Sequence, residues 1–255
     1  MMSSSSLKIF SILFISTLGL SACATHDFPQ MEPAKTAVTE YVLSGEWNKD
    51  ISSTIDKYKS DIENIIASAK PGSQFVAFFD IDETSLSNFK YWFRLQSGFN
   101  QDLWDTWTKE GDAEVIPATL EFYKWLKEKG VKVYFYTGRY QFGNTLQEDA
   151  TVKNLKREGY LNPAGVIFRP QTKASKSDHG AKKHVDFKSA FRCGLSEKGS
   201  TLLLTLGDQW SDHAGDCPAM FQIKLPDSMY TLPKPMMEIQ KKYNYDAGKL
   251  KFPKN

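Results

Sequence analysis

The stretch FFDIDETSLSN, residues 78–88, decides the fold expected of this chain. It completes a short apolar run, FVAFF (75–79), which is typical of a strand buried on both faces. Three acids, Asp80, Asp82 and Glu83, follow at once. Carboxylates this close repel one another, so a bound cation is the simplest account of the cluster.

Apolar runs alternate with helical patterns along the rest of the chain. The expected strands are 75–79, 131–136, 165–168, 201–206 and 220–225. The expected helices between them run from Pro117 to Gly130, over roughly 141–158, and from Phe187 to about Glu197 with Asp186 as N-cap. This alternation predicts an α/β fold with a doubly wound parallel sheet.

Polar groups follow three of these strands at the point where each strand ends. They are Asp80 and Asp82, then Thr137-Gly138-Arg139, then Asp208 and Asp212 in GDQWSD. Parallel sheets bind ligands beyond the carboxyl ends of their strands, so these groups should share one edge. Mg²⁺ prefers oxygen ligands and is held by one or two carboxylates plus a substrate phosphate. The alternative, that the aspartates only cap helices and turns, explains one of them better than four.

The order and spacing of these motifs resemble a known family. D-x-D-E-T at 80–84, T-G-R at 137–139, a lysine, and G-D-x-x-x-D at 207–212 resemble the four motifs of the haloacid dehalogenase superfamily. The tail FQIKLPDSMY (221–230) resembles the branch that holds bacterial class B and class C nonspecific acid phosphatases and plant vegetative storage proteins. The resemblance covers about residues 35–232. It implies a Rossmann-like core, Mg²⁺ dependence and hydrolysis of small phosphomonoesters.

The resemblance also implies roles for the acids. Asp80 is the nucleophile that takes the phosphoryl group. Asp82 donates a proton to the leaving alcohol and then accepts one from water, and its backbone carbonyl joins Asp80 and Asp208 on Mg²⁺. Asp212 lies behind these ligands and orients a metal-bound water or the lysine. Because Asp82 must begin protonated, we expect an acidic pH optimum.

Phosphate binding falls to the groups after the second strand and to a lysine. The resemblance implies that the Thr137 hydroxyl and the Gly138 N–H bind phosphate oxygens, while Arg139 either binds phosphate or braces the loop as an ion pair. The run KASKSDHGAKKHVDFK offers several lysines, most of them on a solvated face. We choose Lys188 because it lies two residues after the expected N-cap, in a first turn that favours anions. Lys176 is the second choice.

Aromatic residues crowd the insert between the first two motifs, 86–116. Part of this set must be ordinary core, and the insert sits where the superfamily places cap elements. We expect it to form a small α-helical subdomain with the N-terminal helices, 35–72. Exposed rings there would stack on flat leaving groups, which favours aryl phosphates and nucleoside monophosphates over sugar phosphates. The candidate rings are Trp92, Tyr91, Trp104 and Trp107.

The N-terminus has the pattern of an export signal. Residues 1–22 carry one charge, Lys8, ahead of an apolar stretch and small residues. Leu20-Ser21-Ala22-Cys23 resembles the bacterial lipobox, so we expect cleavage before Cys23, lipid on that cysteine, and a tether over 23–34. An ordinary signal peptide cleaved nearby is the alternative. Ala24 resembles the sorting signal for the outer membrane, so the expected location is the cell envelope.

Composition limits the partners. The chain has 32 Lys+Arg and 30 Asp+Glu, and removal of Lys8 with the signal leaves the two signs almost equal, which gives no case for a nucleic-acid polymer. Beyond Cys23 the cysteines are Cys193 and Cys217, which either pair or stay as buried thiols. His213 follows the last motif acid, and a surface role is expected for it. The sequence gives no indication of an oligomeric state.

Three functions remain open at this point. The first is a Mg²⁺-dependent acid phosphatase of the cell envelope. The second is a phosphotransferase that passes the phosphoryl group to an alcohol. The third is a noncatalytic surface or storage protein, which the presence of every motif residue disfavours.

Overall fold

The computed structural model describes residues 31–96, 98–170 and 181–230, and for 181–186 it describes the backbone only. The expected signal peptide, Cys23 and Lys176 fall outside these residues. Within them, no helix has the length and apolar character that a membrane span requires.

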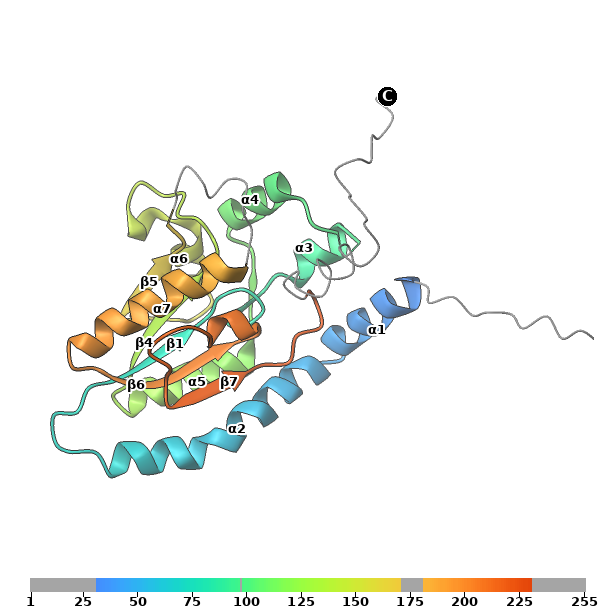
Figure 1. The fold of residues 1–255 in the computed structure, drawn as a ribbon. Coiled ribbons are helices and arrows are strands. Elements are labelled where there is room, and N and C mark those ends of the chain that lie inside the picture. Colours follow the sequence, from blue (N-terminus) through green and yellow to red (C-terminus); the bar gives the residue numbers. More distant parts are fainter. Residues whose placement is uncertain (1–30, 97, 171–180, 231–255) are drawn as a thin grey trace, which may run out of the picture. The chain divides into compact units, whose positions relative to one another are not determined.

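Five parallel strands form the central sheet in the order β5-β4-β1-β6-β7 (Figure 1). They are β1 (Phe75–Phe79), β4 (Lys132–Thr137), β5 (Gly165–Phe168), β6 (Thr201–Gly207) and β7 (Phe221–Lys224). Every residue of β1 is buried, as its unbroken apolar run predicts for a strand covered on both faces. The α/β fold expected from the sequence is confirmed, and each strand agrees with its predicted range to within a residue or two.

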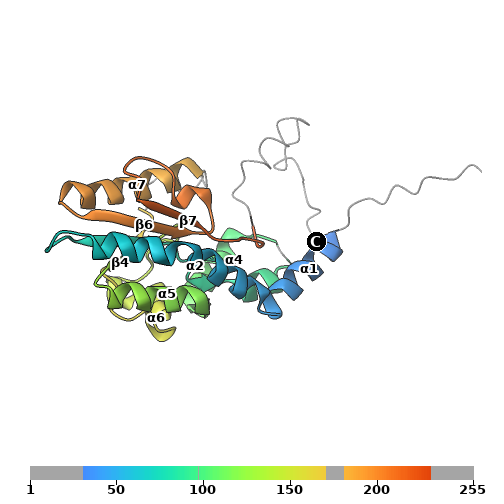
Figure 2. The same cartoon turned by 90° about the horizontal axis from the view of Figure 1, so that it is seen from below.

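Helices cover both faces of this sheet. Figure 2 shows α7 (Ala181–Glu197) on one side of the strands and α5 (Pro117–Glu128) and α6 (Ala150–Arg157) on the other. Helix α7 begins six residues before the predicted start, so Asp186 lies inside the helix and is not its N-cap.

Helix α6 is shorter than the predicted 141–158. The segment before it is a loop with a 3₁₀ turn, η1 (Leu146–Glu148). Hydrogen bonds from backbone N–H groups of this loop to the carboxylate of Asp149 hold it in a non-helical conformation. Its Oδ2 accepts from the N–H groups of Phe142 and Gly143, at 2.8 and 3.1 Å. Its Oδ1 accepts from Thr151 N at 2.8 Å and so caps α6.

The N-terminal helices are α1 (Met31–Leu43) and α2 (Glu46–Ala67). Helix α2 lies against α5 and β7, and its Ile51 and Ile55 are buried in the main hydrophobic core. Trp47 Nε1 donates to the carbonyl of Pro226 at 3.1 Å, a contact across 179 residues. Residues 31–34, predicted as tether, are the first turn of α1.

The insert after β1 is helical, as predicted. It contains β2 (Leu86–Ser87), α3 (Phe89–Arg94), α4 (Gln101–Glu110) and β3 (Glu114–Val115), and β2 pairs with β3 in antiparallel fashion. The short β2–β3 ladder therefore closes the base of the insert next to the carboxyl end of β1. Asn100 caps α4 by accepting from Leu103 N at 3.0 Å.

Candidate active site

Asp80 is the first residue after β1 and lies at the carboxyl edge of the sheet. Its N–H donates to the carbonyl of Leu206 in β6 at 2.9 Å, which fixes its backbone between the two strands. Its Oδ1 accepts from Lys188 Nζ at 2.5 Å, and no donor in the described ranges reaches Oδ2. Burial raises the pKa of Asp80, while the ammonium of Lys188 lowers it.

Lys188 is the lysine chosen from the sequence, and it lies in the middle of α7 rather than in a first turn. Its side chain is 2% exposed, and Nζ also donates to Asp212 Oδ1 at 2.7 Å. Burial by itself lowers the pKa of Lys188, but the carboxylates of Asp212 and Asp80 raise it above its ordinary value. The ammonium therefore remains charged between two carboxylates.

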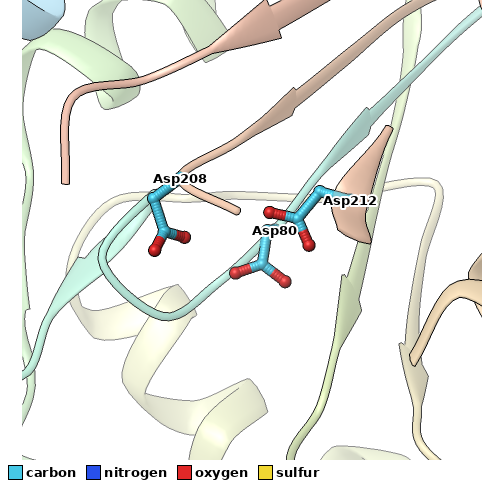
Figure 3. Close-up of side chains that lie close together, drawn as sticks. All are labelled: Asp80, Asp208 and Asp212. Carbon is cyan, nitrogen blue, oxygen red and sulfur yellow. The ribbon is translucent and has the colours of Figure 1, made fainter. Parts of the chain in front are cut away.

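Three carboxyl groups meet at this edge. Asp80, Asp208 and Asp212 each offer an oxygen within 4.8 Å of the others, and Figure 3 shows their side chains close together. Asp208 accepts from Thr84 Oγ1 at 3.0 Å, and burial raises its pKa well above the usual range. An all-oxygen, anionic donor set of this kind fits Mg²⁺. Asp212 accepts from Lys188 Nζ through Oδ1 and from Gln209 N through Oδ2 at 2.9 Å, and its bond to the lysine is in keeping with an orienting role.

Asp82 is held mainly through one oxygen. Arg139 donates to Oδ1 from Nε at 2.9 Å and from a terminal nitrogen at 2.7 Å, and Asn88 Nδ2 donates to the same atom at 2.9 Å. The hydroxyl of Thr137 reaches Oδ2 at 3.3 Å. Of the two roles open for Arg139, the ion pair is the one the structure contains, and the arginine pairs with Asp82 itself.

Comparison with known proteins shows the family. The family model of HAD superfamily, subfamily IIIB (acid phosphatase), matches residues 11–233. The chain belongs to this family of acid phosphatases. The enzyme class expected from its motifs is thereby confirmed.

Relatives of this phosphatase include plant proteins. The stem 28 kDa glycoprotein of Glycine max is 33% identical over 212 residues, which cover 78% of this chain and 75% of that protein. Acid phosphatase 1 of Solanum lycopersicum is 33% identical over 158 residues, 61% of this chain and 58% of that protein. The tungstate-bound class C acid phosphatase from Bacillus anthracis has the same fold, with a TM-score of 0.60, 22% identity, and coverage of 86% of this chain and 92% of that one.

Two residues of the phosphatase site had no role assigned from the sequence: Asn88 was not singled out, and Glu83 was named only as one of three crowded acids. Glu83 adopts a left-handed backbone conformation, with φ of 55°, which is uncommon for a residue with a side chain. Its carboxyl group is buried and accepts from the backbone N–H of Asn88 at 2.8 Å and from Asn88 Nδ2 at 3.1 Å. Burial raises the pKa of Glu83 to about 8. Nothing local in the sequence indicates that Asn88 contacts these carboxyl groups, so its place in the site was not predicted.

A further layer of contacts holds the segment that carries Asp212. Arg192, fully buried in α7, donates to backbone carbonyls of this segment, including those of Asp212 at 3.3 Å and Cys217 at 3.2 Å. Cys193 and Cys217 form a disulfide, which decides between the two alternatives left open for these cysteines. His213 is buried, contrary to the surface role predicted, and its Nδ1 lies 2.8 Å from Thr205 Oγ1.

The aromatic rings of the insert are less exposed than predicted. Tyr91, Trp92 and Trp107 are 4%, 7% and 3% exposed, so the premise that these rings are free to stack is wrong for them. They pack against one another because the insert needs a core of its own. Tyr91 is further committed by a bond from its hydroxyl to the carbonyl of Asn100 at 3.0 Å. Trp104 is half-buried. The ring of Trp92 packs against that of Tyr230, with 5.4 Å between the ring centroids.

Proposed function

We propose that this phosphatase hydrolyses phosphomonoesters in two displacements, through an aspartyl-phosphate on Asp80, with Mg²⁺ bound at its acid cluster. The observation that supports this most is the position of Asp80. Its Oδ1 is engaged by Lys188 while Oδ2 has no donor among the described residues, so one oxygen is anchored and the other is available as nucleophile.

In the first displacement, Oδ2 of Asp80 attacks phosphorus and the bond from phosphorus to the leaving oxygen breaks. The Thr137 hydroxyl and the Gly138 N–H bind phosphate oxygens, and the Lys188 ammonium offsets part of their charge. Asp82 gives its proton to the leaving oxygen. Arg139 and Asn88 both donate to Oδ1, and the Thr137 hydroxyl, which reaches Oδ2 at 3.3 Å, turns to the phosphate, so that proton is carried on Oδ2.

In the second displacement, water attacks the phosphorus of the aspartyl-phosphate and the bond to Asp80 breaks. Asp82, now a carboxylate, takes a proton from that water and returns to its starting state. Transfer to an alcohol in place of water would use the same groups. Product analysis with added alcohol measures how the two outcomes divide.

The metal would be held by the carboxylates of Asp80 and Asp208 and by the backbone carbonyl of Asp82, with Asp212 orienting Lys188 beside them. When bound, Mg²⁺ offsets the charge of the buried carboxylates and of the phosphate and so favours ionised Asp80. We expect an acidic pH optimum, because the first displacement consumes a proton from the general acid.

Replacement of the two acids tests the proposal. Asp80→Asn removes the nucleophile, so turnover of 4-nitrophenyl phosphate should fall to background. After acid quenching of a reaction with a ³²P-labelled ester, this variant should carry no ³²P as an acyl phosphate. Asp82→Asn should still take up label at Asp80 from an aryl ester, because a phenolate leaves without help, but should release it slowly. Wild-type turnover in Asp80→Asn would exclude the aspartyl-phosphate.

Substrate choice is proposed to depend on Trp104, the one candidate ring of the insert that is half-buried rather than buried. We expect Trp104→Leu to raise KM for a nucleoside monophosphate more than for glycerol phosphate. The control is Trp125→Leu, a ring of α5 stacked on Phe122 at 5.7 Å. Equal losses on both substrates would mean that the role of Trp104 is structural.

The location is proposed from the sequence alone. Lipid on Cys23 would attach the enzyme to the outer membrane, and two or three acyl chains give a firm anchor where one gives a marginal one. Cys23→Ala should then leave the protein unprocessed or off the membrane. Unchanged fractionation, with no acylated N-terminal peptide by mass spectrometry, would exclude the anchor.

A further inference from the structure

Asn88 lies at the centre of the hydrogen bonds around the proposed general acid. It is fully buried at the N-terminus of α3, a position where asparagine ordinarily accepts a bond from the helix backbone. In this structure its side chain makes no capping bond. The amide is turned inward, toward Asp82 and Glu83, so the usual structural reason for asparagine at this position does not apply.

The neighbours of Asn88 fix the orientation of its amide. Trp107 Nε1 donates to Oδ1 at 2.8 Å, and a terminal nitrogen of Arg139 donates to the same oxygen at 3.1 Å. An indole N–H and a guanidinium can only donate, so the side facing them must be the carbonyl oxygen. The NH₂ group is thereby directed at Asp82 Oδ1, 2.9 Å away, and at Glu83 Oε2, 3.1 Å away.

We propose that Asn88 is a positioning residue for Asp82 and that it connects the cap helix α4 to the acid through Trp107. This rests on the proposed function, in which Asp82 donates a proton. With Asn88 and Arg139 both donating to Oδ1, that oxygen is reserved as an acceptor and Oδ2 carries the proton. When the bond from phosphorus to the leaving oxygen breaks and the bond to Asp80 forms, the proton passes from Oδ2 to the leaving oxygen. Water returns a proton to Oδ2 in the second displacement.

The choice of leaving group separates this role from a structural one. Ethyl phosphate releases an alkoxide, which needs the proton, whereas 4-nitrophenyl phosphate releases a phenolate that does not. We expect Asn88→Ala to lower kcat/KM for ethyl phosphate by about 10- to 100-fold, within the roughly 10²–10⁴-fold that general acid catalysis contributes. For 4-nitrophenyl phosphate the loss should stay within about threefold, since the acid adds little to that substrate. The informative quantity is the ratio of the two values.

Asn154 provides a matched control. It is also fully buried, and it holds the insert through two bonds to the backbone of Ala113, at 2.8 and 3.1 Å, without contacting Asp82 in the described structure. Asn154→Ala should lower the midpoint of thermal unfolding and leave the ratio of the two kcat/KM values unchanged. A change of the ratio in Asn154→Ala as large as that in Asn88→Ala would overturn the proposal, because packing alone would then account for it.

Two further variants keep the test decisive. Trp107→Phe retains a ring but removes the donor to Asn88 Oδ1, so the ratio should shift in the same direction by a smaller factor. This variant decides the matter if Asn88→Ala does not fold, and an unchanged ratio in it would then overturn the proposal. Asp82→Asn separates the two hypotheses. An unchanged ratio there would refute Asp82 as the acid, whereas a changed ratio with none in Asn88→Ala would refute the role of Asn88 alone.

Discussion

Lys188 and Asp212 are joined by a bond of 2.7 Å from Nζ to Oδ1, and the disulfide Cys193–Cys217 links the same two segments five residues further along each. Both links span a sequence separation of 24 residues. Helix α7 is therefore fixed at two points to the motif-four segment, residues 207–217, which begins with the G-D-x-x-x-D motif. One point is the ion pair at the site, and the other is the disulfide behind it.

The ion pair should be important for stability in the absence of metal. Lys188→Met leaves the buried carboxylates of Asp80 and Asp212 without their cation, and removal of one partner of a buried pair costs about 3–5 kcal/mol. We expect the free energy of unfolding in urea, measured with EDTA present, to fall by that amount. A loss below about 1 kcal/mol would mean that the carboxyl groups take up protons at no measurable cost.

Chelation should remove activity and stability together. EDTA is expected to abolish turnover, and Mg²⁺ at about 100 times its dissociation constant should raise the free energy of unfolding by about 2.7 kcal/mol. Asp208→Asn should lose most of this stabilisation. Asp216→Asn, at an exposed acid of the neighbouring loop, should keep it. Equal stabilisation of all three proteins would place the metal elsewhere.

Reduction of the disulfide should act on unfolding more than on turnover. A closed loop of this length stabilises by about 3 kcal/mol, which corresponds to a Tm lower by roughly 6–12 °C after reduction. Activity at low temperature should survive, because Arg192 still binds the carbonyls of the motif-four segment. The double variant Cys193→Ser/Cys217→Ser should match the reduced wild type and be insensitive to reductant. Any further effect of reductant on that variant would show a different target.

Alkaline pH should destabilise the fold through its buried tyrosines. Burial raises the pKa of Tyr123 to about 12, and burial raises that of Tyr160 well above its ordinary value. The folded chain therefore keeps protons that the unfolded chain releases above about pH 10, so stability is full below pH 10 and falls as the pH rises toward 12.

Tyr123→Phe checks this sign. It removes the bond from the hydroxyl to the carbonyl of Leu161, 2.7 Å long, and should cost about 1 kcal/mol at pH 8. Between pH 9 and 11 its Tm should fall less steeply than that of the wild type. Parallel curves would show that Tyr123 does not contribute to the alkaline loss.

The sheet and the main site could be predicted because their sequence signals are local. A strand buried on both faces is a short apolar run, and the acids that end β1 and β6 stand directly after such runs. Lys188 lies beside Asp80 and Asp212, but the reason for which it was chosen does not hold, since α7 begins at Ala181 and the lysine lies in its interior. What positions it is the carboxylates across the sheet edge, and no local pattern reports that contact.

The remainder of the site depends on contacts between distant segments. From the sequence, Trp107 is predicted to be an exposed ring that stacks on a substrate. In the structure its N–H donates to Asn88, 19 residues away. From the sequence, Arg139 could bind phosphate or form an ion pair that braces its loop. In the structure it pairs with Asp82, 57 residues away. Both side chains have the chemistry for either role, so only the folded geometry separates the alternatives.

The contact between Trp47 and Pro226 bears on the order in which the protein is made. Helix α2 leaves the ribosome first, and the segment whose carbonyl its Trp47 binds follows 179 residues later. That segment continues into Asp227, whose carboxylate accepts from Gln209 at 2.6 Å, and Gln209 in turn donates to Asp208 at 2.7 Å. A nascent chain that stops before Asp227 therefore lacks the carboxylate that holds Gln209 against Asp208.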